Sequence, residues 1–301
     1  MRSCCEPGEM IRSPRIVGDP PTKDISSVLK AVNARSFDTA QVYLQSRIIP
    51  TKKSLDSHVM EYSPPPLSAQ THSHDEKVHI ILAASGSVAT IKLPNIAEAL
   101  SRHHNVSIRI IVTKSAERFL DGQSLEQPSL EALRAVPGVE AIYRDEDEWK
   151  TPWTRGDPIL HIELRKWAHL LLVAPLSANT MAKMTMGIAD NLLLSVMRAW
   201  DTTGLVDGKI KIKKPLIFVA PAMNTAMWNH PVTGKQIEIL EKEWGVNNAS
   251  KDGWVSVLRP MEKHLACGDT GNGAMMDWEA IVCVVEQYIG AQPRRRSSIT
   301  G

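Results

Sequence analysis

Three residues with side chains suited to proton transfer or substrate recognition lie in short polar segments of the chain. They are His161, Asn224 and Cys267, each close to an expected boundary between a loop and a helix. An imidazole exchanges protons near neutral pH, a carboxamide can hold a carboxylate or an amide, and a thiol can donate a proton. These three residues would form a catalytic set if the fold brought them to one site.

The surroundings of His161 indicate the start of a helix. Asp157 followed by Pro158 predicts an N-cap residue and a proline at the first helical position. His161 would then lie in or just after the first turn, where the helix dipole disfavours a charged imidazole. A neutral ring can accept a proton, although a single histidine is more often an ordinary surface or core residue.

Asn224 and Cys267 allow two interpretations each. Asn224 follows an apolar run and precedes a short helical pattern, so its carboxamide could bind a substrate or could cap the helix. Cys267 lies in a segment rich in glycine, which predicts a mobile lid with an exposed thiol. Cys283, in contrast, lies in an apolar helical pattern and is expected to be structural.

The elements that must position these residues alternate regularly along the chain. Near-continuous apolar runs, separated by helical patterns, occur at residues 78–84, 106–112, 139–143, 170–174 and 216–220. Such runs are typical of parallel strands that are buried on both faces. The pattern predicts a doubly wound α/β fold, a flavodoxin-like or Rossmann-like parallel sheet with helices on both faces.

Four polar loops of small residues directly follow expected strands, and ligands in such sheets bind beyond the carboxyl ends of the strands. The loops begin at Ser85, Thr113, Pro175 and Pro221. In the first loop Gly86 permits a tight turn, and Ser87 can cap the next helix while backbone N–H groups face an anion. Taken alone, that loop would be an ordinary turn. Because the Gly-x-Gly-x-x-Gly dinucleotide pattern is absent, a mononucleotide is the better expectation.

These segments together resemble one enzyme family. Ala84–Ala89, Ala174–Thr180, Pro221–Trp228 and Ala266–Met275 are similar to the phosphopantothenoylcysteine decarboxylases, flavoproteins that oxidatively decarboxylate cysteine derivatives. The resemblance runs from about Lys77 to about Tyr288, and Pro-x-Met-Asn-x-x-Met-Trp is its most specific element.

The resemblance implies a cofactor, a substrate and a set of site residues. The cofactor is FMN, bound by Gly86, Ser87, Val88, Thr113, Ser115, Ser177, Ala178, Asn179, Thr180 and Met223. The substrate is 4′-phospho-N-pantothenoylcysteine, bound by Asn224, Lys263, His264 and Ala266, and the product is 4′-phosphopantetheine of coenzyme A biosynthesis. The family usually has a second basic residue where His264 stands.

The resemblance also implies roles and an assembly. His161 would serve the oxidative decarboxylation, Asn224 would hold the substrate carboxyl end, and Cys267 would protonate in the reductive half of the reaction. Flavin is needed because decarboxylation of an ordinary amino acid carboxylate lacks an electron sink, which oxidation of the thiol to a thioaldehyde provides. The family forms homotrimers whose active sites lie between subunits, so each His161 would meet Asn224 and Cys267 of a neighbour.

Two other functions come from the same group of proteins. Fungal halotolerance proteins bind and inhibit a Ser/Thr protein phosphatase, and the long N-terminus here is compatible with that role. Such a regulator need not keep His161, Asn224 and Cys267, however, and this chain has all three. Oxidative decarboxylation of a peptide that ends in cysteine is the other alternative.

Composition bounds the remaining choices. The net charge of +2 among 301 residues gives no electrostatic reason to expect a nucleic-acid partner. No apolar run long enough to span a membrane occurs, no secretory pattern stands at the N-terminus, and the four cysteines follow no disulfide or zinc pattern. These features predict a cytoplasmic protein.

Composition also divides the chain. Residues 1–76 are rich in proline and serine with few apolar pieces, which predicts a mostly disordered extension. Residues 77–290 form the expected decarboxylase domain. Residues 291–301 carry three consecutive arginines and are expected to be a flexible basic tail, with a phosphorylation or targeting signal as the alternative.

Overall fold

The computed structural model describes residues 62–124, 126–206, 214–247, 249, 252–264 and 270–290. These residues belong to one compact unit that begins at Tyr62. The expected basic tail and most of the expected N-terminal extension lie outside the described residues. Among the helices in the described ranges, none is both long and apolar enough to cross a membrane.

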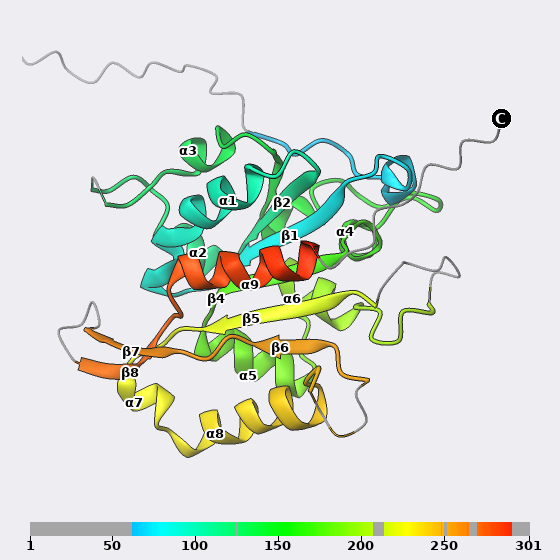
Figure 1. The fold of residues 1–301 in the computed structure, drawn as a ribbon. Helices are drawn as coiled ribbons and strands as arrows, with labels where there is room; N and C mark the ends of the chain where they lie inside the picture. Colours follow the sequence, from blue (N-terminus) through cyan, green and yellow to red (C-terminus); the bar gives the residue numbers. More distant parts are fainter. Residues whose placement is uncertain are drawn as a thin grey trace, which may run out of the picture. The chain divides into compact units, whose positions relative to one another are not determined.

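A parallel sheet of six strands forms the centre of this unit, in the order β3-β2-β1-β4-β5-β6 (Figure 1). The strands are β1 (Val78–Ala84), β2 (Val106–Val112), β3 (Val139–Tyr143), β4 (Leu170–Leu176), β5 (Leu216–Pro221) and β6 (Val255–Val257). Every residue of β2 and β4 is buried, as strands covered on both faces require. This Rossmann-type order confirms the doubly wound α/β prediction.

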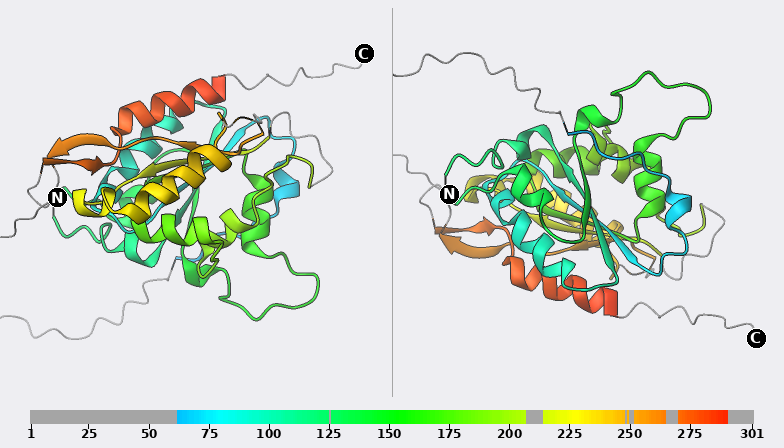
Figure 2. Two further views of the ribbon diagram at one scale, coloured as in Figure 1. Left: turned by 90° about the horizontal axis from the view of Figure 1, so that it is seen from below. Right: turned by 90° about the horizontal axis from the view of Figure 1, so that it is seen from above.

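Helices cover both faces of the sheet, because alternate strand residues point to opposite sides. Ile80 and Leu82 of β1 pack under one layer, and Ile81 and Ala83 pack under the other. The first layer contains α1 (Leu93–Ser101), α3 (Leu130–Arg134) and α9 (Trp278–Gly290). The second layer contains α4 (Leu160–Trp167), α5 (Ala178–Met186), α6 (Leu192–Arg198) and α8 (Pro231–Glu238). Figure 2 shows the sheet between these two layers.

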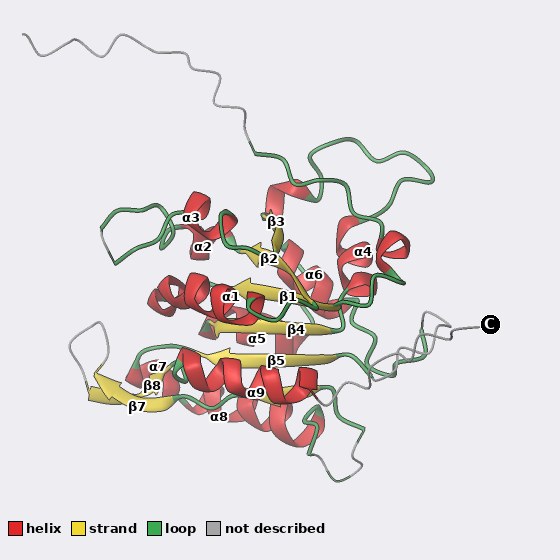
Figure 3. Ribbon diagram, turned by 45° about the horizontal axis from the view of Figure 1, so that its top comes forward, coloured by secondary structure: helices red, strands yellow, loops and turns green. Residues whose placement is uncertain are grey.

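Several short elements complete the described unit. Two four-residue helices, α2 (Lys114–Glu117) and α7 (Thr225–Trp228), follow β2 and β5. The 3₁₀ turns are η2 (Ala69–His72), η3 (Val88–Lys92) and η4 (Asp145–Asp147), and the π-helical turn η5 (Ile239–Glu243) continues α8. An antiparallel hairpin of β7 (Met261–His264) and β8 (Thr270–Ala274) extends beyond the main sheet beside α7 (Figure 3).

The domain begins before the boundary that composition suggested at residue 77. Leu67 is buried in the core of the second layer. The hydroxyl oxygen of Tyr62 accepts a hydrogen bond from the backbone of Ile142 (3.2 Å), and the backbone of Ala69 donates one to Glu163 (2.8 Å). Assigning residues 62–76 to the disordered extension was therefore wrong. Buried Leu67, partly buried Tyr62 and Ala69, and a few directional bonds hold this segment. Such scattered contacts leave no periodic pattern in the sequence.

The last helix, α9, buries one apolar face. Its buried residues lie in the core between the first layer and the sheet, at helical spacing, namely Ile281, Val282, Val285 and Ile289. Cys283 lies away from that face and is exposed, so the expectation that it is structural, on the apolar side of the helix, was wrong.

Candidate active site

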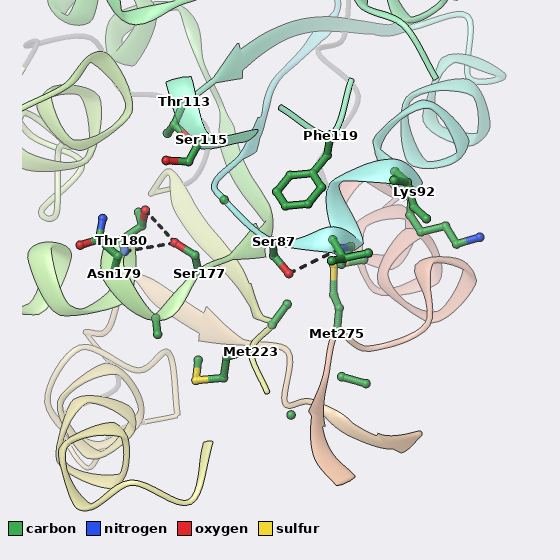
Figure 4. A pocket seen from close by; sticks show the side chains of 18 of the residues that line it. Ser87, Lys92, Thr113, Ser115, Phe119, Ser177, Asn179, Thr180, Met223 and Met275 are labelled. Atoms are coloured by element: carbon green, nitrogen blue, oxygen red, sulfur yellow. Dashed lines mark hydrogen bonds between the residues drawn. The ribbon is translucent and has the colours of Figure 1, made fainter. Parts of the chain in front are cut away.

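A cavity of about 830 Å³ opens at the carboxyl edge of the sheet. It lies where the strand order reverses between β1 and β4, which is the switch point at which doubly wound sheets bind ligands. Loops that follow β1, β2, β4 and β5 form its wall, together with residues after β8 (Figure 4). All the residues expected to contact the cofactor line it, namely Gly86, Ser87, Val88, Thr113, Ser115, Ser177, Ala178, Asn179, Thr180 and Met223.

Three hydroxyl side chains in this wall cap the starts of helical segments. Ser87, Thr113 and Ser177 each accept a hydrogen bond from a backbone N–H two or three residues ahead, at 3.2–3.4 Å. They cap η3, α2 and α5, which follow β1, β2 and β4 respectively. Helix starts that share one edge of a sheet direct their positive ends toward the same space, so the cavity favours an anion.

Two close approaches hold the first loop in place. A Cβ atom on Gly86 would lie 2.6 Å from the Cβ of Ser115, so only glycine fits at this position. Ser85 donates its hydroxyl hydrogen to the carbonyl of Pro175 (3.1 Å) and accepts from the backbone of Ser177 (2.8 Å). The loops after β1, β2 and β4 are thus held against one another by direct contacts.

The sequence interpretation did not name several other residues of the wall. Lys92, Phe119, Lys183 and Met275 line the cavity, and so does Asp145. Burial raises the pKa of the Asp145 carboxyl group above its usual value, although a backbone hydrogen bond opposes this effect. Lys183 could have been found, because it stands one helical turn after residues 179 and 180 on the same helix. Lys92 ends the turn that begins at Val88, and Met275 ends a segment that carries the family resemblance. Phe119 and Asp145 lie in turns with no local signal.

The glycines near the thiol segment permit close packing of β8. The backbone N–H of Met223 donates to the carbonyl of Gly273 (2.9 Å). A Cβ atom on Gly273 would lie 2.2 Å from the carbonyl oxygen of Met223, and one on Gly271 would lie 1.7 Å from the hydroxyl of Thr225. These two glycines therefore let the hairpin dock against the loop after β5, which the expectation of a mobile lid did not include.

Asn224 caps a helix, which is one of the two roles that the sequence left open. Its Oδ1 atom accepts a hydrogen bond from the backbone of Met227 (2.8 Å) and caps α7. The side chain is exposed and lines the cavity. Because capping uses only the oxygen, the amide nitrogen can donate a hydrogen bond to a ligand.

The residues expected to bind the substrate lie partly beyond what the structure describes. Lys263 and His264 belong to β7, where they pair with Gly271 and Thr270 of β8. Ala266 and Cys267 lie outside the described residues. The described part of the hairpin nevertheless adjoins the site, because Gly273 and Ala274 line the cavity.

His161 lies in the first turn of α4, but the helix does not begin as predicted. The N-cap position belongs to Ile159, and its side chain makes no capping bond. Asp157 instead accepts a hydrogen bond from the backbone of Thr154 (2.9 Å) and closes the preceding turn. Predicting Asp157 as the N-cap was therefore wrong, because a local turn competes for the same carboxylate.

A carboxylate holds the imidazole of His161. Its Nδ1 atom donates a hydrogen bond to Glu148, and the backbone N–H of His161 lies 3.4 Å from the same oxygen. The side chain of Glu148 is 5% exposed and that of His161 is 23% exposed. The nearest charge to the ring is thus a carboxylate, rather than the helix dipole that the sequence suggested. Within one chain His161 does not line the cavity that Asn224 lines.

Comparison with known proteins identifies the family of this chain. Residues 68–290 match the family model described as Flavoprotein, which is most of the chain. The chain belongs to the Flavoprotein family.

Named relatives and solved structures align with most of the chain. A phosphopantothenoylcysteine decarboxylase of Arabidopsis thaliana is 41% identical over 232 residues, which are 77% of this chain and 94% of that relative. A solved PPC decarboxylase mutant complexed with pantothenoylaminoethenethiol is 40% identical at a TM-score of 0.56, covering 71% of this chain and 100% of that one. The structure called the FMN binding protein AtHal3 is 41% identical at a TM-score of 0.55, covering 72% and 99%.

Proposed function

We propose that this protein decarboxylates 4′-phospho-N-pantothenoylcysteine to 4′-phosphopantetheine with the help of FMN, a step of coenzyme A biosynthesis. The observation that carries the proposal is the cavity at the switch point, lined by loops after four strands, in a chain of the Flavoprotein family. Relatives named for this activity match nearly along their whole length. Their names also favour this function over phosphatase regulation and over peptide decarboxylation.

The residues of the cavity suit FMN. Capped helix starts and the close approach at Gly86 form a cradle for a phosphate, and Phe119, Met223 and Met275 offer apolar surface for an isoalloxazine ring. Lys92 adds positive charge to the lining, and Lys183, which also lines the cavity, is paired with Asp190. Bound FMN would supply the two-electron chemistry that oxidises the substrate thiol and later returns the hydride.

The side chains of the chain would bind the substrate and move its protons. Nδ1 of His161 donates its hydrogen to Glu148, so Nε2 carries the free lone pair of the ring. Nε2 is therefore the atom that can take a proton from the substrate. The amide nitrogen of Asn224 donates to the substrate carboxylate while its oxygen keeps α7 capped. Lys263 and His264 neutralise the substrate phosphate, and Cys267 donates a proton in the reductive half.

A complete site requires more than one copy of the chain. His161 stands outside the cavity that Asn224 lines, so an imidazole from a neighbouring copy would have to complete it. We therefore favour a homotrimer with sites shared between subunits, working in the cytoplasm on a small molecule.

Purification of the full chain tests the proposal. The protein should be yellow, release FMN on denaturation, and convert phosphopantothenoylcysteine to 4′-phosphopantetheine, measured by mass spectrometry. A His161→Asn variant is the control, because it should keep the flavin and lose the activity. Protein that stays colourless after incubation with FMN, or flavin-loaded protein without turnover, would overturn the proposal.

A further inference from the structure

Three potential metal ligands meet outside the cavity, where η2 leads into β1. His72, Asp75 and His79 each contribute one ligand atom, and these atoms lie within 4.8 Å of one another. Oδ2 of Asp75 is 3.3 Å from Nδ1 of His72 and 2.9 Å from Nε2 of His79. None of these residues has a role in the proposed decarboxylation.

The hydrogen bonds of His79 determine which ring nitrogen faces the carboxylate as an acceptor. Its Nδ1 atom lies 3.1 Å from the carbonyl oxygen of Trp167. A carbonyl only accepts, so Nδ1 carries the hydrogen and the Nε2 atom of a neutral ring directs its lone pair at Asp75. Two acceptors 2.9 Å apart repel each other unless a proton or a metal cation lies between them.

The ring of His79 is held rigidly in a buried position. Its side chain is 4% exposed and stacks between the rings of Trp167 and His169, with centroid distances of 4.5 and 4.9 Å. Metal-bound histidines commonly donate their other N–H to a carbonyl, as His79 does to Trp167.

We propose that His72, Asp75 and His79 bind one divalent transition-metal ion of the zinc type. Two imidazoles and a carboxylate are ligands that zinc prefers, and a water molecule would complete the shell. Ligand atoms around a tetrahedral zinc ion lie about 3.3 Å apart, given bonds of about 2.0 Å. Oδ2 of Asp75 lies 3.3 and 2.9 Å from the two imidazole nitrogens, and those nitrogens lie within 4.8 Å of each other. The side chains of His72 and Asp75 are 27% and 25% exposed, so the ion can enter from solvent.

Such an ion would link the segment that precedes β1 to the sheet. His72 ends η2, whose first residue, Ala69, donates a hydrogen bond to Glu163 of α4 (2.8 Å). His79 belongs to β1, so a shared ion joins η2 to a central strand. The expected role is structural, and metal binding should therefore raise the melting temperature.

The test uses the full FMN-loaded chain after treatment with a chelator. Titration with Zn²⁺ should show one site per chain that His72→Gln and Asp75→Asn each remove, and saturating Zn²⁺ should raise Tm by a few degrees in the unaltered chain only. Co²⁺ should give visible absorption with intensities typical of a tetrahedral site. His74→Gln is the matched control, because His74 is exposed in the same segment and should leave binding unchanged.

Two results would overturn the proposal. One is the absence of a site that saturates at one ion per chain. The other is equal binding by the His72→Gln variant, which would assign the bound zinc to residues elsewhere. Circular dichroism and flavin content show whether each variant is folded, and His72→Gln carries the test if Asp75→Asn is not.

Discussion

Glu148 fixes the orientation of His161 through one carboxylate oxygen, which accepts from the ring Nδ1 atom and faces the backbone N–H of the same residue at 3.4 Å. Thirteen positions separate the two residues, and Glu148 follows the turn η4 whereas His161 opens α4. Because the carboxylate is nearly buried, water competes little for it. The imidazole is therefore held in one tautomer with Nε2 open for chemistry.

Replacing Glu148 should lower turnover in proportion to the loss of this hydrogen bond. Glu148→Gln keeps an acceptor for Nδ1 and should reduce kcat about tenfold, whereas Glu148→Ala should reduce it about a hundredfold. KM and flavin content should change little, since Glu148 does not line the cavity. Steady-state kinetics measures this split, and ¹⁵N NMR of the histidines reports the tautomer. If both variants kept the kcat of the unaltered chain, Glu148 would not position the ring.

The two functions of Asn224 can be separated by one substitution. Asn224→Asp keeps the oxygen that accepts from Met227, so Tm and flavin content should stay near those of the unaltered chain. It removes the N–H donors and adds a charge that repels the substrate carboxylate, so kcat/KM should fall at least about a hundredfold. Calorimetry and kinetics on one sample test both expectations. A large drop in Tm with intact turnover would reduce Asn224 to a helix cap.

Mixed oligomers test whether sites are shared between copies. His161→Asn and Asn224→Asp chains should each be inactive alone. After mixing by refolding or coexpression, about a quarter of the sites should contain both native residues if His161 and Asn224 come from different chains. Activity should then return to that fraction. Mixtures that remain inactive, although mass spectrometry shows hetero-oligomers, would place both residues in the same subunit's site.

An alanine at position 273 should disturb the docking of β8. Its Cβ atom would lie 2.2 Å from a backbone carbonyl that cannot move alone, so flavin affinity should fall about tenfold or more and Tm should drop. Gly234→Ala is the matched control, because nothing lies within 4 Å of a Cβ added there and the residue lies inside α8. That control should keep or slightly raise Tm. Flavin fluorescence titration and calorimetry measure both effects.

The buried carboxylate of Asp201 should make the free energy of unfolding depend on pH in the acid range. Burial alone would raise its pKa, but hydrogen bonds from Thr203, Gly204 and Val206 lower it below the ordinary value of 3.8. A group whose pKa is lower in the folded state stabilises the fold above pH 3.8 and loses this effect as the pH falls through the folded value. Asp201→Asn should cost about 1–3 kcal/mol at neutral pH. Denaturation curves of both proteins should converge below pH 3.8, and parallel curves would contradict this.

The sequence alone predicted β1 to β5 and the four loops that form much of the cavity wall, whereas β6 was not predicted. Buried parallel strands are continuous apolar runs, and the carboxyl ends of such strands meet at one edge, so local patterns place Gly86, Thr113, Ser177 and Asn224 near each other. Capping by Ser87 was predicted for the same reason, because a cap depends on residues only a few positions away. These features depend on periodicity and on neighbours in the chain.

The tertiary structure decided the features that depend on distance between remote segments. The bond from His161 to Glu148, the docking of Gly273 against Met223 and the burial of Leu67 join elements with no shared local pattern. Asp157 is a further example, because its carboxylate accepts a hydrogen bond from the preceding turn and does not cap the helix. Hydrogen bonds and close packing are directional and act over a few ångströms, so only the folded arrangement of strands and loops determines which partners meet.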